Sequence, residues 1–396
     1  MKLLAISKAG HSSVNREVYT TLCRQYKHKV TLVIPRYLMI NNKKVDSDPF
    51  NDPPYEIIAL ALLGVDRSSR YRGILGVLKY SKPDIVYYED DPMTFSAILL
   101  GVWCKWKKKK FACRTNHNRP LKIRAEIARL GPPKGLLSAV IKMSLMAISA
   151  KFIDHLFVIS NDGMRIFSQM GLTNVSKIPL GFNEERFKIN DEERTFLRNE
   201  LNINSIVISY MGRIFEGKGV HILIEALNQI KEQDWVFLVD KFELYSDPYK
   251  KKIDSLIGSY GLKKRTIFFD ADHTQIASYM NASDIIVVPS ITTDSFKEEY
   301  GRIAPEAMGA GCLVVVSDSG TLPELVSDSG WVFQEGNIDE LAGLLKKLIL
   351  QKNKKSLGES ASKFAHENLG LNKQALIMNE IFKNLVTKKQ YKHQIY

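Results

Sequence analysis

The chain has 396 residues, of which 45% are hydrophobic and 25% charged, a composition typical of a globular protein with enough chain for two domains. Its four cysteines have neither metal-binding spacing nor a disulfide framework, which indicates buried thiols in a reducing compartment. The first residues form a strand-like run without the features of a signal peptide, and the most apolar segment, 135–153, is interrupted by Lys142 and Lys151. We therefore expect a cytoplasmic protein and exclude a disulfide-rich secreted module, and the apolar segment is too polar to predict a membrane span.

The net charge of +13 is concentrated in one half of the chain. Residues 1–180 hold 29 Lys and Arg against 13 Asp and Glu, a net charge of +16, whereas residues 181–396 hold 27 against 30, a net charge of −3. A strongly basic half indicates an anionic partner. The candidates are a membrane surface, a phosphorylated substrate and a nucleic acid.

Strand-like and helix-like segments alternate along the whole chain, as in parallel sheets with crossover helices. The predicted strands are 3–6, 30–34, 85–88, 111–114, 156–159, 206–211, 235–239, 266–269, 285–288 and 313–316. The predicted helices are 16–26, 94–105, 220–233, 248–260, 274–280, 304–309 and 338–350, with a further helix that begins near Ser160. Two α/β domains follow, 1–183 and 184–370, with 371–396 as a C-terminal helix and basic tail.

Polar loops leave the predicted strands of the first half, where a doubly wound sheet binds its ligands. Gly10 and His11 follow the first strand, although a lone loop histidine is often only solvated. The cluster Glu89-Asp90-Asp91 follows the third strand, and its compressed spacing favours a loop or a helix cap over a metal site. His117 and Asn118 follow the fourth strand, where a site role and a structural role are both open.

A basic segment with two tryptophans, 103–110, precedes the fourth strand. Tryptophan prefers the membrane interface, and each lysine near an anionic surface contributes about 1 kcal/mol of binding energy. Together with the lysine-flanked apolar segment 136–153, it predicts peripheral contact with an anionic membrane, at the inner face. The alternative is a solvated helix end.

The second half opens with a strand, Gly212 and Arg213, then Lys218 and a helix. Glycines and basic residues between a strand and a helix are typical of a phosphate-binding loop, but the glycine spacing and the Lys-Ser/Thr pair of a P-loop are missing. The alternative is a surface basic pair. Further on, Asp270 and Asp272 imitate an Asp-x-Asp metal motif, and we interpret them as a loop and not as a Mg²⁺ site.

Two carboxylates, Glu298 and Glu306, lie eight residues apart with Gly301 between them. They follow a strand-like run, and Pro305 is in the first turn of a predicted helix. This arrangement places backbone N–H groups where an anion could bind. The alternative is a solvated loop charge and a carboxylate that favours a helix N-terminus.

Residues 298–311 resemble the Glu-x7-Glu signature of the family 4 glycosyltransferases, retaining enzymes of the GT-B fold, and residues 313–324 extend the resemblance. It covers about residues 1–382 and is strongest over 208–332. The resemblance implies an α/β protein of two Rossmann-like, doubly wound parallel-sheet domains that face a central cleft. The N-terminal domain would bind the acceptor and the C-terminal domain the donor.

The resemblance also implies a role for each loop. Arg213 and Lys218 would bind the donor diphosphate, Glu306 the ribose hydroxyls and Glu298 the sugar hydroxyls. Gly212, Gly301, Arg302 and Ile303 would complete the donor site. His117 and Asn118 would lie beside the reacting sugar, and Gly10 and His11 on the acceptor side. Members of the family often carry a double glycine after the first strand and a glycine-containing loop after the strand 235–239, whereas this chain has Gly10 alone and no glycine in 240–244.

The implied reaction transfers a hexosyl group from a nucleotide diphosphate sugar to a hydroxyl of a glycan or lipid-linked acceptor, in cell-surface polysaccharide biosynthesis. No metal, cofactor or nucleic acid is expected. One alternative is another GT-B enzyme, a sugar-nucleotide hydrolase, an epimerase or a phosphorylase-like enzyme, although a pyridoxal lysine motif is not apparent. The other is a non-catalytic scaffold whose basic half binds anionic lipid or nucleic acid.

Overall fold

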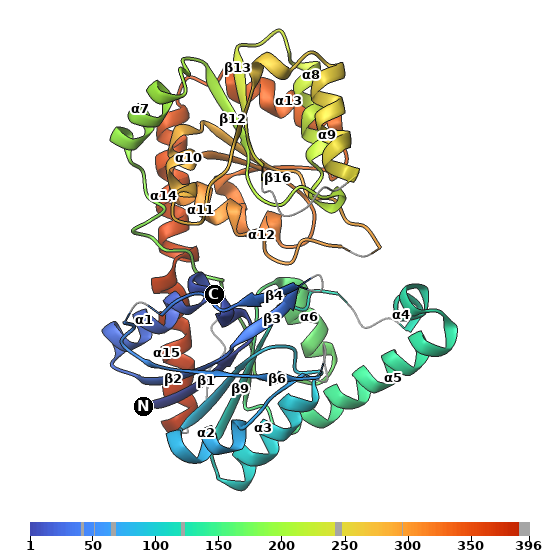
Figure 1. Ribbon diagram of the computed structural model, residues 1–396, viewed down its shortest axis with the longest axis vertical. Helices are drawn as coiled ribbons and strands as arrows, with labels where there is room; N and C mark the ends of the chain where they lie inside the picture. Colours follow the sequence, from blue (N-terminus) through green and yellow to red (C-terminus); the bar gives the residue numbers. More distant parts are fainter. Residues whose placement is uncertain are drawn as a thin grey trace. The chain divides into compact units, whose positions relative to one another are not determined.

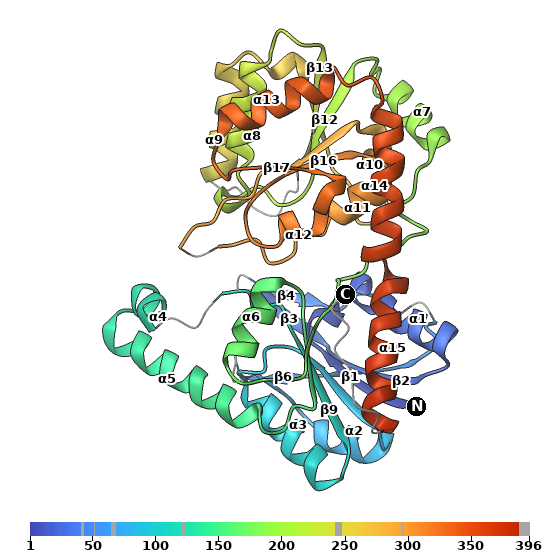
Figure 2. The same ribbon diagram turned by 180° about the vertical axis from the view of Figure 1, so that it is seen from behind.

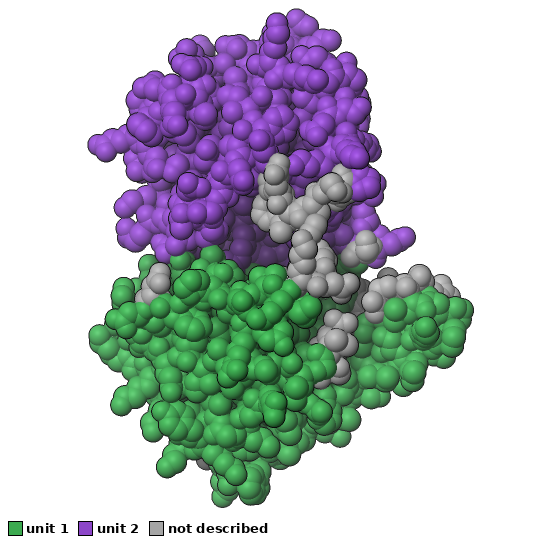
Figure 3. Space-filling view, viewed as in Figure 1, with its two compact units in different colours: residues 1–181, 371–396 green, residues 182–370 purple. Residues whose placement is uncertain are grey.

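The computed structural model describes residues 1–40, 43–50, 52–64, 69–119, 123–241, 248–294 and 296–387, and it forms two compact units (Figure 3). Unit 1 comprises Met1–Gly181 and the segment from Leu371, and unit 2 comprises Phe182–Gly370. The sequence placed the first boundary two residues later and treated residues 371–396 as a separate segment. Residues 388–396 of the expected basic tail, and 242–244 of the loop without glycine, lie outside the described residues.

Unit 1 is built on a parallel sheet with the strand order β11-β10-β9-β8-β1-β2-β5 (Figure 1). The strands are β1 (Lys2–Ser7), β2 (Lys29–Pro35), β5 (Glu56–Leu60), β8 (Ile85–Glu89), β9 (Lys110–Thr115), β10 (His155–Val158) and β11 (Val175–Lys177). The chain moves outward from β1 through β2 to β5 and then returns to β8 on the other side of β1. The order therefore reverses between β1 and β8, the position at which doubly wound sheets bind ligands.

Helices cover both faces of this sheet (Figure 2). Leu78, Leu100 and Phe167 belong to an apolar core on one face, whereas Tyr19 and Phe382 belong to the core on the other. The helices of the first face are α2 (Ile74–Ser81), α3 (Phe95–Trp106), α5 (Pro132–Ser149) and α6 (Asn161–Gln169), and those of the second are α1 (Glu17–Tyr26) and α15 (Leu371–Thr387). The last helix of the chain thus completes the core of the first unit.

Smaller elements of unit 1 surround the sheet. α4 (Ile123–Leu130) packs against α5, and two short antiparallel pairs join β3 (Tyr37–Ile40) to β4 (Lys43–Asp46) and β6 (Leu62–Leu63) to β7 (Arg70–Tyr71). Thr94 and Ser160 cap α3 and α6, because each hydroxyl accepts a hydrogen bond from the backbone three residues later. The sequence did not predict these pairs, β5 or α2.

Unit 2 contains a second parallel sheet, with the order β14-β13-β12-β15-β16-β17. Its strands are β12 (Ile206–Tyr210), β13 (Trp235–Asp240), β14 (Thr266–Phe269), β15 (Ile285–Val288), β16 (Leu313–Ser317) and β17 (Trp331–Phe333). This order reverses between β12 and β15. The predicted pair of doubly wound parallel sheets is confirmed.

Two groups of helices flank the second sheet (Figure 1). α8 (Val220–Gln229), α9 (Pro248–Ser259) and α13 (Ile338–Ile349) share one apolar core with the sheet. The remaining helices are α7 (Asp191–Glu200), α10 (Ile276–Ala282), α11 (Ile303–Gly309), α12 (Leu322–Val326) and α14 (Lys354–Leu369). The helix predicted over 220–233 ends at Gln229, and the helix predicted over 274–280 begins at Ile276.

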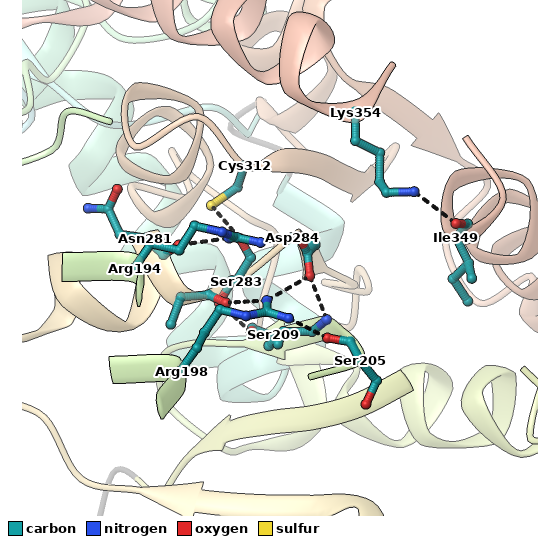
Figure 4. A network of polar contacts seen from close by, with 12 residues as sticks. Arg194, Arg198, Ser205, Ser209, Asn281, Ser283, Asp284, Cys312, Ile349 and Lys354 are labelled. Carbon is teal, nitrogen blue, oxygen red and sulfur yellow. Dashed lines mark hydrogen bonds and ion pairs between the residues drawn. The ribbon is translucent and has the colours of Figure 1, made fainter. Parts of the chain in front are cut away.

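A network of charges fixes α7 to the amino edge of the second sheet (Figure 4). Asp284, which directly precedes β15, accepts hydrogen bonds from Arg194 at 2.5 Å and from Arg198 at 3.1 Å. The backbone N–H of Val207 in β12 donates to the same carboxylate at 2.8 Å. Because candidate ligand residues lie at the carboxyl edge, this network is a structural anchor at the opposite edge.

The four cysteines are buried and free, as the sequence predicted. Burial raises the pKa of Cys104 and that of Cys312 to about 12, so neither is a reactive thiolate. Within the described ranges, no helix has the length and hydropathy needed to cross a membrane.

Candidate functional site

Two loops of unit 2 meet at the reversal of its strand order. The loop after β12 carries Lys218, and the loop after β15 carries Glu298. Gly219 lets the two loops approach each other closely. Its φ is +65°, and a side chain at this position would place its Cβ atom 1.8 Å from the carbonyl oxygen of Pro289. Glycine favours this conformation, and only glycine permits this close approach. A hydrogen bond from the N–H of Ile291 to the carbonyl oxygen of Gly217, 2.9 Å, reinforces the contact.

Lys218 and Glu298 form an ion pair in these loops. The Nζ atom of Lys218 donates to Oε2 of Glu298 at 2.5 Å, and the two side chains are 17% and 7% exposed. Ser290, which is fully buried, donates its hydroxyl to the same oxygen at 2.8 Å. Ser317, at the end of β16, donates to the Ser290 carbonyl at 2.5 Å. The carboxylate is thus oriented by the lysine and by a serine that the sheet positions.

The segment from Gly301 to Glu306 begins α11. Gly301 has a φ of +70°, and a Cβ atom there would lie 2.4 Å from the side chain of Leu322. Arg302 is half-buried and precedes Ile303, at which α11 begins, one residue before the predicted start. Glu306 is 2% exposed and lies in the first turn of this helix. Both glutamates of the pair are therefore buried groups, and the solvated-loop alternative is wrong for Glu298.

Arg213 presents a contrast to Lys218, because its side chain is exposed. Its carbonyl oxygen accepts a hydrogen bond of 2.6 Å from the hydroxyl of Tyr210, a residue whose pKa is raised by burial. Its guanidinium lies 5.4 Å from the centre of the Phe215 ring. The backbone of Arg213 is fixed next to Gly212 while its charge remains accessible, an arrangement that suits the binding of an anion from solvent.

The predicted residues Gly10 and His11 lie in a 3-10 turn after β1, at the strand-order reversal of unit 1. The N–H of Gly10 donates to the Ser7 hydroxyl at 2.9 Å. His11 is half-buried, and its Nδ1 lies 3.3 Å from the carbonyl oxygen of Lys8. The position at the reversal agrees with a binding role, and the role of His11 stays a prediction.

His117 and Asn118 lie two and three residues after the end of β9, also in unit 1. The N–H of His117 donates to the Thr115 hydroxyl at 3.1 Å, and its ring meets Phe167 edge-on at 6.3 Å between centres. Asn118 is 3% exposed. These contacts fix both residues at the carboxyl edge of the sheet, two strands away from β1.

Two of the acidic residues noted in the sequence, Glu89 and Asp272, make structural contacts. Glu89 is the last residue of β8, is 5% exposed and lies 3.2 Å from the guanidinium of Arg114. The carboxylate of Asp272 accepts hydrogen bonds from the backbone and hydroxyl of Thr274, which lower its pKa. Among the residues whose placement is described, no group of three or more His, Cys, Asp or Glu side chains could hold a metal ion.

The structure thus brings the predicted donor residues Lys218 and Glu298 into contact within unit 2 and places the predicted acceptor residues at the carboxyl edge of the sheet of unit 1. The sequence missed Ser290 and Ser317, which orient Glu298. It also missed Thr321, whose hydroxyl donates to the Glu299 carbonyl at 2.8 Å and holds the loop. Ser290 and Ser317 lie at or just beyond the carboxyl ends of predicted strands, a position that could have indicated them.

Comparison with solved structures identifies the architecture. The chain aligns with Anabaena HepE in complex with UDP at a TM-score of 0.71 and 18% identity, over 97% of this chain and 100% of that one. It aligns with the sucrose-phosphate synthase of Thermosynechococcus elongatus at a TM-score of 0.70 and 17% identity, over 98% of this chain and 100% of that one. The protein therefore has the GT-B fold.

Sequence comparison identifies the domain within this fold. Residues 191–364 match the family model described as Glycosyl transferases group 1. A curated relative is the lipopolysaccharide 1,2-N-acetylglucosaminetransferase of Salmonella typhimurium, which is 27% identical over 212 residues. The match covers 49% of this chain and 54% of that relative, so the chain spans about half the relative's length.

Proposed function

We propose that this protein is a retaining glycosyltransferase of the family 4 type. It transfers a hexosyl group from a nucleotide diphosphate sugar to a hydroxyl of a glycan or lipid-linked acceptor. The observation that carries the proposal is the Lys218–Glu298 pair, which lies at the strand-order reversal of unit 2 and inside the glycosyl transferases group 1 domain.

The pair supports a binding mode for the donor. An ammonium group suits a phosphate oxygen, and a carboxylate suits sugar hydroxyls. Since the two groups are 2.5 Å apart, one ligand that carries both a phosphate and a sugar can contact them together. In this proposal Lys218 contacts the diphosphate and Glu298 the hydroxyls of the sugar, on either side of the bond that breaks.

The other donor residues follow from this placement. Exposed Arg213, next to Gly212, provides a second positive charge for the diphosphate, whose negative charge grows as the sugar leaves. Glu306 binds the ribose, while Gly301, Arg302 and Ile303 bring the backbone of the loop to the donor. Because Arg213 and Lys218 supply the positive charge, we expect transfer without a bound metal ion.

Unit 1 binds the acceptor in this proposal. Gly10 and His11 lie at its strand-order reversal, and His117 and Asn118 lie at the same edge of its sheet. His117 assists proton transfer at the attacking or departing oxygen. The relative from Salmonella is named as a lipopolysaccharide N-acetylglucosaminetransferase, which supports an acceptor in cell-surface polysaccharide assembly. The proposed site of action is cytoplasmic.

A donor panel tests the proposal. Purified protein is incubated with UDP-, GDP- and ADP-sugars, with and without acceptor glycans and EDTA, and the nucleotide released and the sugar product are measured. We expect one donor to be consumed, an acceptor-dependent product of retained configuration, and no loss in EDTA. Free sugar as the main product with every acceptor indicates a hydrolase, a changed sugar nucleotide indicates an epimerase, and no turnover indicates a scaffold. Each of these three results contradicts the proposal.

A further inference from the structure

In helix α5 the apolar face points outward and the polar face inward, the reverse of a typical helix on the surface of a globular protein. Its buried positions recur at helical spacing and hold mostly small or polar residues, namely Gly135, Ala139, Lys142, Met146 and Ser149. Its exposed positions include large apolar residues, namely Leu136, Leu137, Val140, Ile141, Met143 and Ile148. A helix in contact with water has its apolar side against the core. The outer face of α5 is therefore built for contact with an apolar surface.

Hydrogen bonds hold this orientation in place. The ammonium group of Lys142 forms a buried ion pair with Glu126 of α4, and Ser138 donates its hydroxyl to the same carboxylate at 2.9 Å. The side chains of Lys142 and Ser138 thereby have their hydrogen-bond partner within the α4–α5 pair. Because the charged pair lies on the inner side, a rotation of α5 that buried its apolar face would break it.

The apolar face is continuous. From Leu136 to Ile148 the helix rises about 18 Å, and Leu137 near its beginning is 62% exposed. α3, which packs beside α5, also exposes large apolar side chains, among them Trp106 at 70%. Figure 1 shows the α4–α5 pair extending away from the sheet of unit 1. Single exposed apolar residues are common in proteins, but a contiguous set marks an interaction surface.

Lysines border this face. Lys134 and Lys151 lie at the two ends of α5, and both are exposed. At the end of α3, Lys107 and Lys108 are also exposed, and the ammonium group of Lys107 lies 3.6 Å from the centre of the Trp106 ring. The half of the chain that contains these residues has a net charge of +16. The chemistry of the border matches an anionic surface.

We propose that the outer face of α5, with Trp106 and its neighbouring lysines, docks the protein on an anionic lipid bilayer. The apolar side chains enter the boundary of the acyl chains, and the lysines contact the lipid headgroups. A second copy of the chain fits less well, because an antiparallel two-fold pairing of α5 places Lys134 of each copy opposite Lys151 of the other. The inference rests on unit 1 alone and does not require glycosyl transfer.

Vesicle sedimentation of the full chain tests this surface. We expect binding to vesicles of phosphatidylcholine and phosphatidylglycerol, weaker binding in high salt and weaker binding to pure phosphatidylcholine. The double variant Leu137→Asp/Ile141→Asp should bind at least about tenfold more weakly, because it replaces two inserted apolar side chains by charges. Phe196→Asp is the matched control, since Phe196 is 69% exposed on α7 of unit 2, and it should bind like the unaltered protein.

The lysines are tested in the same assay. Lys107→Glu/Lys108→Glu should weaken binding to the anionic vesicles about tenfold or more, while Lys251→Glu, an exposed lysine of unit 2, should not. Circular dichroism verifies that each variant is folded. The proposal is overturned if the unaltered protein stays in solution, if the α5 variant sediments like it, or if sedimentation velocity shows instead a dimer that the α5 variant abolishes.

Discussion

Lys218 and Glu298 lie 2.5 Å apart, although 80 positions separate them in the chain. They come from the two loops that follow β12 and β15, the strands between which the order of the second sheet reverses. Both side chains are largely buried, so each depends on the other for charge compensation. A group that binds at this position has to interact with a preformed pair of opposite charges.

Replacement of Glu298 tests the role of the carboxylate. Glu298→Gln keeps the shape of the side chain but removes the charge that accepts from Lys218 and from sugar hydroxyls. We expect transfer to fall at least about 100-fold, the loss typical for one preorganised charged contact. The turnover rate is measured at saturating donor, and thermal unfolding establishes that the variant is folded. A folded variant with nearly normal turnover would falsify the role given to Glu298.

Ser290 is expected to act by positioning Glu298. Ser290→Ala removes a buried hydrogen bond of 2.8 Å to the carboxylate, which corresponds to a loss of about tenfold in kcat/KM. A double-mutant cycle separates positioning from a general structural effect. In the Glu298→Gln background the same change should cost much less, and an equal loss in both backgrounds argues against positioning.

The anchor of α7 gives a prediction about stability. Asp284→Ala leaves Arg194 and Arg198 without their carboxylate in a site where Asp284 is only 13% exposed, so we expect a loss of about 3–5 kcal/mol in the free energy of unfolding. Asp191, also in α7, forms an exposed ion pair with Lys355 of α14. Asp191→Ala removes this pair and should lower the free energy of unfolding by less than about 1 kcal/mol. Urea unfolding compares the two variants. Equal losses would show that the anchor does not stabilise unit 2.

The regular parts of the fold could be predicted because buried parallel strands are short runs of apolar residues. The runs at 3–6, 206–211 and 313–316 each became a strand of one of the two sheets. The placement of α15 on the first unit could not be predicted, because it depends on contacts between Phe382 and the distant residues Tyr87 and Phe157. The outward orientation of the apolar face of α5 could not be predicted either, since a sequence pattern alone assigns the apolar side of a helix to the core.

The sequence predicted which loops carry the candidate site residues, but not which of these residues contact one another. Glycines, basic residues and carboxylates after strands indicated Lys218 and Glu298 separately. Their contact depends on Gly219, which lets the two loops approach, and on the strand order, which places β15 next to β12. The order of the strands has no local signature in the sequence, and the position of Ser290 after a predicted strand does not reveal that its hydroxyl contacts Glu298.

Acid should destabilise unit 1 through His155. Burial lowers the pKa of this histidine to about 4 from its ordinary value of about 6.5, so between these values the unfolded chain binds the extra proton. Stability is therefore lost as the pH falls, by about 2 kcal/mol between about pH 7.5 and about pH 5, where most carboxylates are still ionised. Urea unfolding at both pH values measures the loss. His155→Phe should reduce it, and an unchanged loss would assign the effect to other groups.

The most direct test of the proposed donor site is to measure donor binding and turnover by the Arg213→Ala variant. Arg213 is exposed, so its removal leaves the packing of unit 2 intact and changes only the positive charge offered to the diphosphate. Lys251→Ala, which removes another exposed charge of the same unit, is the control. With the sugar nucleotide that the unaltered protein consumes, we expect Arg213→Ala to lower turnover at least about 100-fold and to weaken nucleotide binding, while the control behaves normally. Equal turnover and equal nucleotide binding by the Arg213→Ala variant and the unaltered protein would contradict a donor site in these loops.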